Sequence, residues 1–434
     1  MHVYFSGIGG AGIGPLALVA KQAGFEVSGS DKQDSLYISY LKKHGITDIH
    51  IGQDWQQIEK VHNKNPIDWY VYSSAVEKEN ADAPELQFVH QQAIKSSKRD
   101  DFIRFVLDEK HLKMIAVAGT HGKTTTTAMV IWLFKQLETH ISYSVGAKIN
   151  FGDMGEYEPK SEYFVYECDE FDRNFLAFEP HISLISGVSW DHHEIFPSRE
   201  SYQQAFREFI GQSKWTILWQ EDVDYLSINV DATNNLSIQN SSVIRNAKYD
   251  IQIPGLYNRL DGWLAIQAVH EVTNVPIKTL IRHLNKFPGL QRRMERIIPG
   301  LYSDYAHTPE KIRGGMSVAL EMAGNKQAVV VIYEPLTNRR QHYMVNDYQD
   351  CFAGANKVYW IPSYLAREDP KQPVLSPSEL IRHLSDPSIA EAAERDENLV
   401  KIIRKHLKQG DMVICMAGGG GNSLDEWIRE KFKK

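Results

Sequence analysis

A glycine-bounded turn followed by Lys-Thr is the stretch of this sequence with the clearest chemistry. The stretch reads Val117-Ala118-Gly119-Thr120-His121-Gly122-Lys123-Thr124-Thr125. An apolar run, Met114 to Ala118, precedes it, and a helix-compatible run, Thr124 to Leu137, follows. Strand, turn and helix in this order form a phosphate-binding loop, because glycines let successive N–H groups point at phosphate oxygens.

The side chains of this loop predict separate roles. Lys123 is expected to reach the β- and γ-phosphates, the Thr124 hydroxyl to sit on Mg²⁺, and the helix N-terminus to add partial positive charge. The standard G-x-x-x-x-G-K-[ST] pattern has a glycine where this chain has Val117, so a plain turn with a solvated lysine is the alternative. The flanking elements favour the phosphate loop. As a loop residue outside the core, Lys123 is expected to be dispensable for folding.

A second glycine-rich loop stands at the N-terminus. A strand from His2 to Phe5 leads into Gly7-Ile8-Gly9-Gly10-Ala11-Gly12-Ile13-Gly14, and a helix and a second strand ending at Asp31 follow. This βαβ pattern, with its acid nineteen residues after Gly12, indicates a pyrophosphate site. A nicotinamide dinucleotide and a UDP-sugar both fit that description. The residues expected at this site are Gly9, Gly10, Ala11, Gly12, Asp31, and the strand-closing Ser73 and Ser74.

Acidic and histidine side chains follow two further predicted strands. Glu167 comes after the strand Tyr163 to Tyr166, and His192 after the apolar run Ile182 to Val188. Ligands bind at the carboxyl ends of parallel strands, and Mg²⁺ prefers hard oxygen ligands. We therefore expect Glu167 to hold one Mg²⁺ with Thr124, and His192 to serve a second metal. A solvated acidic loop is the alternative.

Strands and helices alternate along the whole chain, which predicts α/β architecture with parallel sheets. Three domains are expected: residues 1–109 as a Rossmann-like domain, 110–296 as a central mononucleotide-binding P-loop sheet, and 297–434 as a second Rossmann-like domain. Asn258, before a helix expected from about Leu260, is predicted either to cap that helix or to face a nucleotide base. The pair Arg292-Arg293 is predicted either to clamp phosphates or to form a solvated turn.

Composition narrows the class of protein. The 434 residues are 42% hydrophobic and 24% charged with a net charge of -7, which fits a globular protein and argues against a nucleic-acid surface. No apolar run approaches a membrane span and no secretory leader is recognised, so we expect a cytoplasmic protein without membrane partners. Three scattered cysteines, Cys168, Cys351 and Cys415, are expected to be reduced thiols.

In its order of motifs, nearly the whole chain resembles the Mur ligases of peptidoglycan precursor synthesis. The motifs are the Gly7-to-Gly14 loop, Gly119-Thr120-His121-Gly122-Lys123-Thr124-Thr125, Glu167-Cys168-Asp169-Glu170, Asp191-His192, Gly255-x-x-Asn258, Gly289-x-x-Arg292-Arg293-x-Glu295 and Asp304-Tyr305-Ala306-His307-x-Pro309. The resemblance implies UDP-sugar, ATP and amine-binding domains in that order. It also implies an ATP- and Mg²⁺-dependent amide ligase that acts through an acyl phosphate, as a monomer or homodimer.

The resemblance implies roles for individual residues. The ATP set would be Gly119, Thr120, His121, Gly122, Lys123, Thr124, Thr125, Asn258, Arg293 and Asp304. Lys123, His192, Arg293 and His307 would be the catalytic residues, with His307 near the incoming amine. Arg340 would bind the carboxylate of that amine.

Departures from the family pattern concern the amine substrate. The loop Glu334-Pro335-Leu336-Thr337-Asn338-Arg339-Arg340 lacks the first arginine of the alanine-adding members, where this chain has Thr337. UDP-N-acetylmuramate with L-alanine is the predicted substrate pair, and the murein tripeptide L-alanyl-γ-D-glutamyl-meso-diaminopimelate is the alternative amine. A nicotinamide-dependent dehydrogenase would leave the phosphate loop unexplained, and an inactive nucleotide-binding regulator is disfavoured because Lys123, Glu167 and His192 are present.

Overall fold

The computed structural model describes residues 1–73, 83–192, 195–365, 368–369, 371–420 and 422–432. The chain forms two compact units, which are described separately. The first contains residues 1–253 and 258–287, and the second contains residues 254–257 and 288–434. Two sheets lie in the first unit and a third lies in the second.

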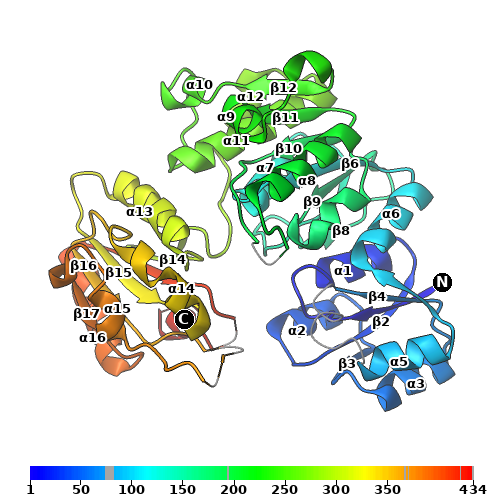
Figure 1. Cartoon of the computed structure of the whole chain (residues 1–434), viewed down its shortest axis with the longest axis horizontal. Coiled ribbons are helices and arrows are strands. Elements are labelled where there is room, and N and C mark those ends of the chain that lie inside the picture. Colours follow the sequence, from blue (N-terminus) through cyan, green and yellow to red (C-terminus); the bar gives the residue numbers. More distant parts are fainter. Residues whose placement is uncertain (74–82, 193–194, 366–367, 370, 421, 433–434) are drawn as a thin grey trace. The chain divides into compact units, whose positions relative to one another are not determined.

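The first sheet is wholly parallel. Its five strands lie in the order β3 (Ile49–Ile51), β2 (Glu26–Asp31), β1 (His2–Ser6), β4 (Trp69–Tyr72) and β5 (Lys95–Lys98). Successive side chains of β1 face opposite ways, so Val3 and Phe5 pack with α1 (Gly14–Gln22) and α6 (Arg99–Glu109), whereas Tyr4 packs with α3 (Trp55–Lys64) and α5 (Pro84–Gln91). Figure 1 shows these helices on the two faces of the sheet.

The second sheet carries the phosphate loop. Its order is β12 (Leu236–Gln239), β11 (Thr216–Trp219), β10 (Ile182–Ile185), β6 (Lys113–Ala118), β9 (Tyr163–Glu167), β7 (Ile141–Ser144) and β8 (Gly155–Glu156). Only the edge strand β8 is antiparallel to its neighbour. The helices of this part are α7 (Lys123–Gln136), the 3₁₀ segment η1 (Phe171–Ala177), α8 (Arg199–Gln212), α9 (Gln220–Leu226), α10 (Ser242–Arg245), α11 (Leu256–Thr273) and α12 (Ile277–Leu284).

The second unit is built on a six-stranded sheet. Its order is β13 (Glu295–Ile298), β14 (Leu301–Asp304), β18 (Met412–Ala417), β15 (Val329–Glu334), β16 (Lys357–Trp360) and β17 (Ala390–Ala392), with only β13 antiparallel. Its helices include α13 (Pro309–Ala323), α14 (Asn338–Met344), α15 (Pro377–Ile381), α16 (Glu397–Gln409) and α17 (Leu424–Phe432). Buried residues on both faces, including Val331 on one and Ile332 on the other, form its two core layers.

The expected α/β architecture is confirmed, and the differences lie at element ends. The strand expected through Val188 ends at Ile185, because Gly187 takes a φ of 132° and the Ser186 hydroxyl turns to bond the Ala118 carbonyl. The helix expected from Leu260 begins at Leu256. The three cysteines are buried and unpaired. Within the described ranges, no helix is both long and apolar enough to span a membrane.

Candidate active site

The phosphate loop has the backbone that its glycines predict. Gly119 and Gly122 take φ values of 140° and 76°, a region that L side chains rarely enter. Space is also restricted: a Cβ on Gly122 would lie 2.5 Å from Asp261 Oδ1, and one on Gly119 would lie 2.6 Å from Ser186 Oγ. The turn between β6 and α7 therefore requires glycine at both positions.

Lys123 is held by a buried acid. Its Nζ lies 2.6 Å from Glu170 Oε2 and donates to the Gly119 carbonyl at 2.5 Å. The Lys123 side chain is 16% exposed and that of Glu170 only 1%. Burial is the largest single effect and disfavours the ammonium form, but Glu170, Asp169 and Glu167 together outweigh it, so the pKa of Lys123 is raised. The alternative of a plain turn with a solvated lysine is therefore wrong, and so is the premise that Lys123 lies outside the packed interior.

Thr124 and Glu167 present adjacent oxygens beside the loop. Thr124 Oγ1 donates to Glu167 Oε1 at 2.7 Å, and Glu167 Oε2 accepts from the Gly146 N–H at 2.9 Å. A hydroxyl and a carboxylate are hard ligands of the kind that a partly hydrated Mg²⁺ accepts, so this pair fits the expected metal. No group of three or more His, Cys, Asp or Glu side chains poised for a metal occurs in the described part of the chain.

Glu170 also lies beside His192. His192 Nε2 is 3.6 Å from Glu170 Oε1, and its ring meets Phe171 edge-on at 5.1 Å between centroids. The Tyr202 hydroxyl approaches Glu170 Oε1 at 3.4 Å and forms a hydrogen bond with Thr120 Oγ1 at 2.7 Å. Sequence reasoning missed Glu170 as a site residue, although it stands in the same acidic run as Glu167. His193, the residue after His192, lies outside the described residues.

Thr125 lies in the first turn of α7, and two further ATP-site expectations in the first unit concern His121 and Asn258. His121 Nε2 lies 3.1 Å from Ser189 Oγ, so the imidazole turns toward the loop after β10. Asn258 is half-buried in the first turn of α11 rather than ahead of the helix. An N-cap residue precedes the helix, so Asn258, the third residue of α11, is not its N-cap, and the contact with a base stays a prediction.

The N-terminal loop is fastened by the acid predicted for it. Asp31 Oδ2 accepts from the Gly9 N–H at 2.8 Å, and a Cβ on Gly9 would lie 2.9 Å from the same oxygen. Gly10, Ala11 and Gly12 continue the turn into α1. Ser73 follows β4 directly, and Ser74 lies outside the described residues.

The second unit distinguishes the two linker arginines. Arg292 donates to the Ala417 carbonyl at 2.7 Å and lies 3.6 Å from Asp425, so its guanidinium is engaged within the unit. Both guanidinium groups lie over the Tyr305 ring, that of Arg292 at 4.5 Å and that of Arg293 at 5.1 Å from its centroid. Asp304 is buried and accepts from the N–H groups of Met294 and Ala306 at 2.8 and 2.9 Å. Asp304 thus fixes the backbone that carries Arg293.

His307 and Arg340 lie at the carboxyl edge of the third sheet. His307 Nδ1 is 2.7 Å from the Tyr305 carbonyl, and burial together with Lys311, Arg340 and Arg293 lowers the pKa of His307 to about 3. The Tyr305 carbonyl opposes this shift but does not cancel it. Arg340 is exposed in the first turn of α14, where its N–H bonds Thr337 Oγ1 at 3.4 Å.

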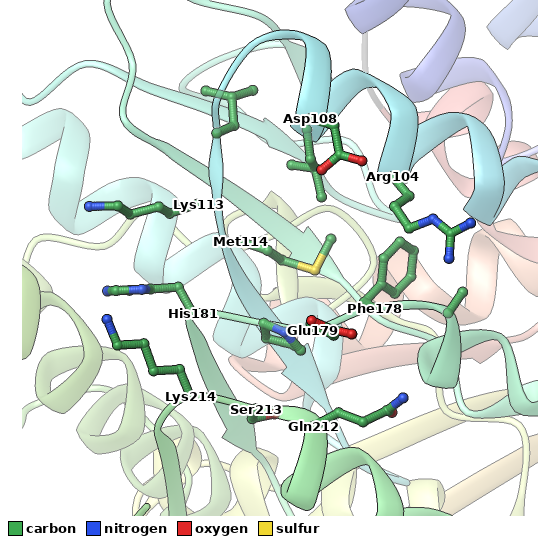
Figure 2. Close-up of a pocket in the computed structure, with 14 residues that line it drawn as sticks. Arg104, Asp108, Lys113, Met114, Phe178, Glu179, His181, Gln212, Ser213 and Lys214 are labelled. Carbon is green, nitrogen blue, oxygen red and sulfur yellow. The ribbon is translucent and has the colours of Figure 1, made fainter.

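A cavity of 560 Å³ lies away from these residues (Figure 2). It opens at the amino ends of β6 and β10, whereas the phosphate loop follows the carboxyl end of β6. Its lining includes Met114, Phe178 and Gln212. The phosphate-loop site is therefore not this cavity.

Taken together, a phosphate loop, a second glycine-rich loop and three mostly parallel sheets are the features of a nucleotide-binding α/β protein. Family models agree with this class. The "Mur ligase family, catalytic domain" model matches residues 2–111, and the "Mur ligase middle domain" model matches residues 117–253. The chain belongs to the Mur ligase family, whose ligases act in peptidoglycan synthesis.

Similar proteins cover the full length of the chain. A UDP-N-acetylmuramate–L-alanine ligase from Clostridium tetani is 30% identical, over 96% of this chain and 95% of that protein. The structure of a UDP-N-acetylmuramate–alanine ligase from Thermotoga maritima covers 100% of this chain and 98% of its own, with a TM-score of 0.76 at 22% identity. A murein peptide ligase from Psychrobacter arcticus aligns with a TM-score of 0.66 at 21% identity, over 99% of this chain and 98% of its own. The structural matches share the three-domain fold.

Proposed function

We propose that the protein joins L-alanine to the carboxylate of UDP-N-acetylmuramate, consuming ATP and releasing ADP and phosphate. The observation that carries this proposal is the phosphate loop whose Thr124 hydroxyl lies 2.7 Å from Glu167, the pair of oxygens that an ATP-bound cation needs. The choice of L-alanine is supported by relatives such as the Clostridium tetani ligase, which bears that activity in its name.

The first step transfers a phosphoryl group. A carboxylate oxygen of the sugar attacks the γ-phosphorus, the bond to the β–γ bridging oxygen breaks, and ADP leaves an acyl phosphate. Such transfers depend on positioning and charge stabilisation, which Lys123 and Arg293 supply to the phosphate oxygens. When bound, Mg²⁺ held by Thr124 and Glu167, with His192 serving a second ion, would neutralise phosphate charge.

The second step forms the amide. The amine nitrogen attacks the acyl carbon, the carbon–oxygen bond to phosphate breaks, and the proton of the nitrogen passes to the departing phosphate or to solvent water. With a pKa of about 3, His307 is neutral near pH 7 and a weak proton acceptor. His307 therefore orients the amine by hydrogen bonding, and Arg340 binds the carboxylate of L-alanine through its planar guanidinium.

The remaining parts of the proposal concern organisation. Residues 1–109 bind the UDP-sugar through Gly9, Gly10, Ala11, Gly12, Asp31, Ser73 and Ser74. Residues 110–296 bind ATP through the phosphate loop, Asn258 and Arg293. Residues 297–434 bind the amine and supply Asp304 to the ATP site. The enzyme works in the cytoplasm as a monomer or homodimer.

Phosphate release tests the proposal directly. The protein receives UDP-N-acetylmuramate and ATP with one amine at a time, at equal concentrations of L-alanine and the murein tripeptide. A higher kcat/KM for L-alanine supports the assignment, whereas a much higher value for the tripeptide overturns the choice of amine and leaves the ligase. Melting shifts with UDP and NADH test the first domain: stabilisation by NADH alone contradicts the UDP-sugar site.

A further inference from the structure

Arg99, the first residue of α6, lies against the N-terminal glycine loop. A Cβ on Gly12 would stand 2.0 Å from Arg99 Nη1 and 3.3 Å from its Cζ. The guanidinium thus occupies the space that the missing side chain of Gly12 leaves open. The Arg99 side chain is only 16% exposed, so this placement is part of a packed site.

Arg99 also lies near Tyr166 and two acids. Its Nη2 lies 3.5 Å from Asp169 Oδ2 and its Nε 3.5 Å from Asp100 Oδ1. Well-formed charge-assisted hydrogen bonds measure about 2.7–2.9 Å, so both contacts are loose. Asp169 belongs to the acidic run after β9, which places Arg99 between the glycine loop and the acids beside the phosphate loop.

The glycine loop and the Arg99 guanidinium have complementary chemistry toward one ligand. A glycine loop of the Gly7-to-Gly12 kind lets its backbone approach a pyrophosphate closely, and it supplies N–H groups but no full positive charge. A guanidinium supplies that charge in a planar fork that matches phosphate oxygens. We propose that Arg99 binds the pyrophosphate of the UDP-sugar, exchanging its loose contact with Asp169 for phosphate oxygens. This inference rests on the proposed function, because it takes the UDP-sugar as the ligand of the loop.

The alternative explanation for the position of Arg99 is a purely structural ion pair with Asp169. Substitution of Arg99 can distinguish this alternative from binding of the pyrophosphate. Arg99→Met keeps the aliphatic stem and removes the charge. Arg104→Met is the matched control, because Arg104 lies on the same helix, is 60% exposed and approaches only Asp101, at 3.9 Å, among its ion-pair partners in the described chain. Binding of UDP and of ATP is measured by calorimetry for the wild type and both variants.

Arg99→Met is expected to raise the Kd for UDP at least tenfold and to leave the Kd for ATP within twofold, with Arg104→Met like the wild type for both. Equal UDP affinity in the two variants would overturn the assignment, as would an equal loss of UDP and ATP affinity, which a general distortion produces. If Arg99→Met lacks a cooperative melting transition, Arg99→Lys decides: a several-fold rise in the Kd for UDP supports the role and a wild-type Kd overturns it. Wild-type protein without UDP affinity would overturn the proposed function as well.

Discussion

Lys123 Nζ lies 2.6 Å from Glu170 Oε2, and this ion pair joins the phosphate loop to the acidic run after β9. Both groups are largely removed from solvent, at 16% and 1% exposure. Glu170 therefore binds the same lysine that the proposed function assigns to the phosphates of ATP. Under the proposed function, we expect ATP either to draw Lys123 away from Glu170 or to share it with that carboxylate.

Lys123→Ala is expected to abolish phosphate release and also to destabilise the fold. Removing one partner of a buried ion pair costs about 3–5 kcal/mol, because the other charge stays buried and uncompensated. The double variant Lys123→Ala/Glu170→Gln should regain most of the lost melting temperature and no activity. Thermal melts and phosphate release on both variants check this, and a single variant that melts like the wild type would contradict the stabilising role of the pair.

The sequence predicted the sheets well where an apolar strand met a glycine turn. β6 and β1 precede glycine loops, and their short apolar runs are typical of buried strands. β5, which reads Lys-Ser-Ser-Lys, was not predicted because a polar edge strand carries no apolar alternation. Its place follows from pairing with β4, which is a tertiary contact.

The sequence identified which residues belong to the site more readily than it identified which of them contact one another. Motif spacing identified Lys123 and Glu167, but nothing in the run Glu167-Cys168-Asp169-Glu170 told which acid turns inward to the lysine. Arg99 gave no signal either, because its contact with Gly12 joins segments far apart in the chain. Such pairings depend on how α6 packs against the first sheet.

Thr124→Val should raise the Mg²⁺ concentration needed for half-maximal phosphate release. The substitution keeps the size of the side chain and removes the oxygen that lies 2.7 Å from Glu167. Glu167→Gln should act in the same direction, because a neutral amide attracts the cation less than a carboxylate does. Mg²⁺ titrations at saturating ATP measure the effect. Midpoints that match the wild type in both variants would show that this pair does not hold the metal.

His307 should stay neutral well below the usual histidine range. Its pKa of about 3 in the fold lies below the unfolded value of about 6.5. The unfolded chain binds the extra proton between these values, so the contribution of His307 to stability is complete above about pH 6.5 and falls as pH drops toward 3. His307→Asn should therefore lose less stability than the wild type between pH 6.5 and 4.5. Melts across this range, with an NMR titration of the imidazole, check it; a resonance that titrates near pH 6.5 would contradict the prediction.

Arg340→Ala is expected to raise the KM for the amine about tenfold and to leave the KM for ATP nearly unchanged, since a lost contact to one substrate weakens binding of that substrate. Arg339→Ala is the matched control. The two arginines are adjacent and exposed in the first turn of α14, and the Arg339 N–H is held by Glu368 at 3.0 Å, so the helix start is retained. Arg340 is also the one of the two that contributes to lowering the pKa of His307, which places its charge near that ring. Initial rates with each substrate varied in turn give the KM for the amine and the KM for ATP separately. Equal rises in the amine KM for both variants would mean that the general positive charge of the turn acts on the amine, and no rise in either would remove Arg340 from the amine site.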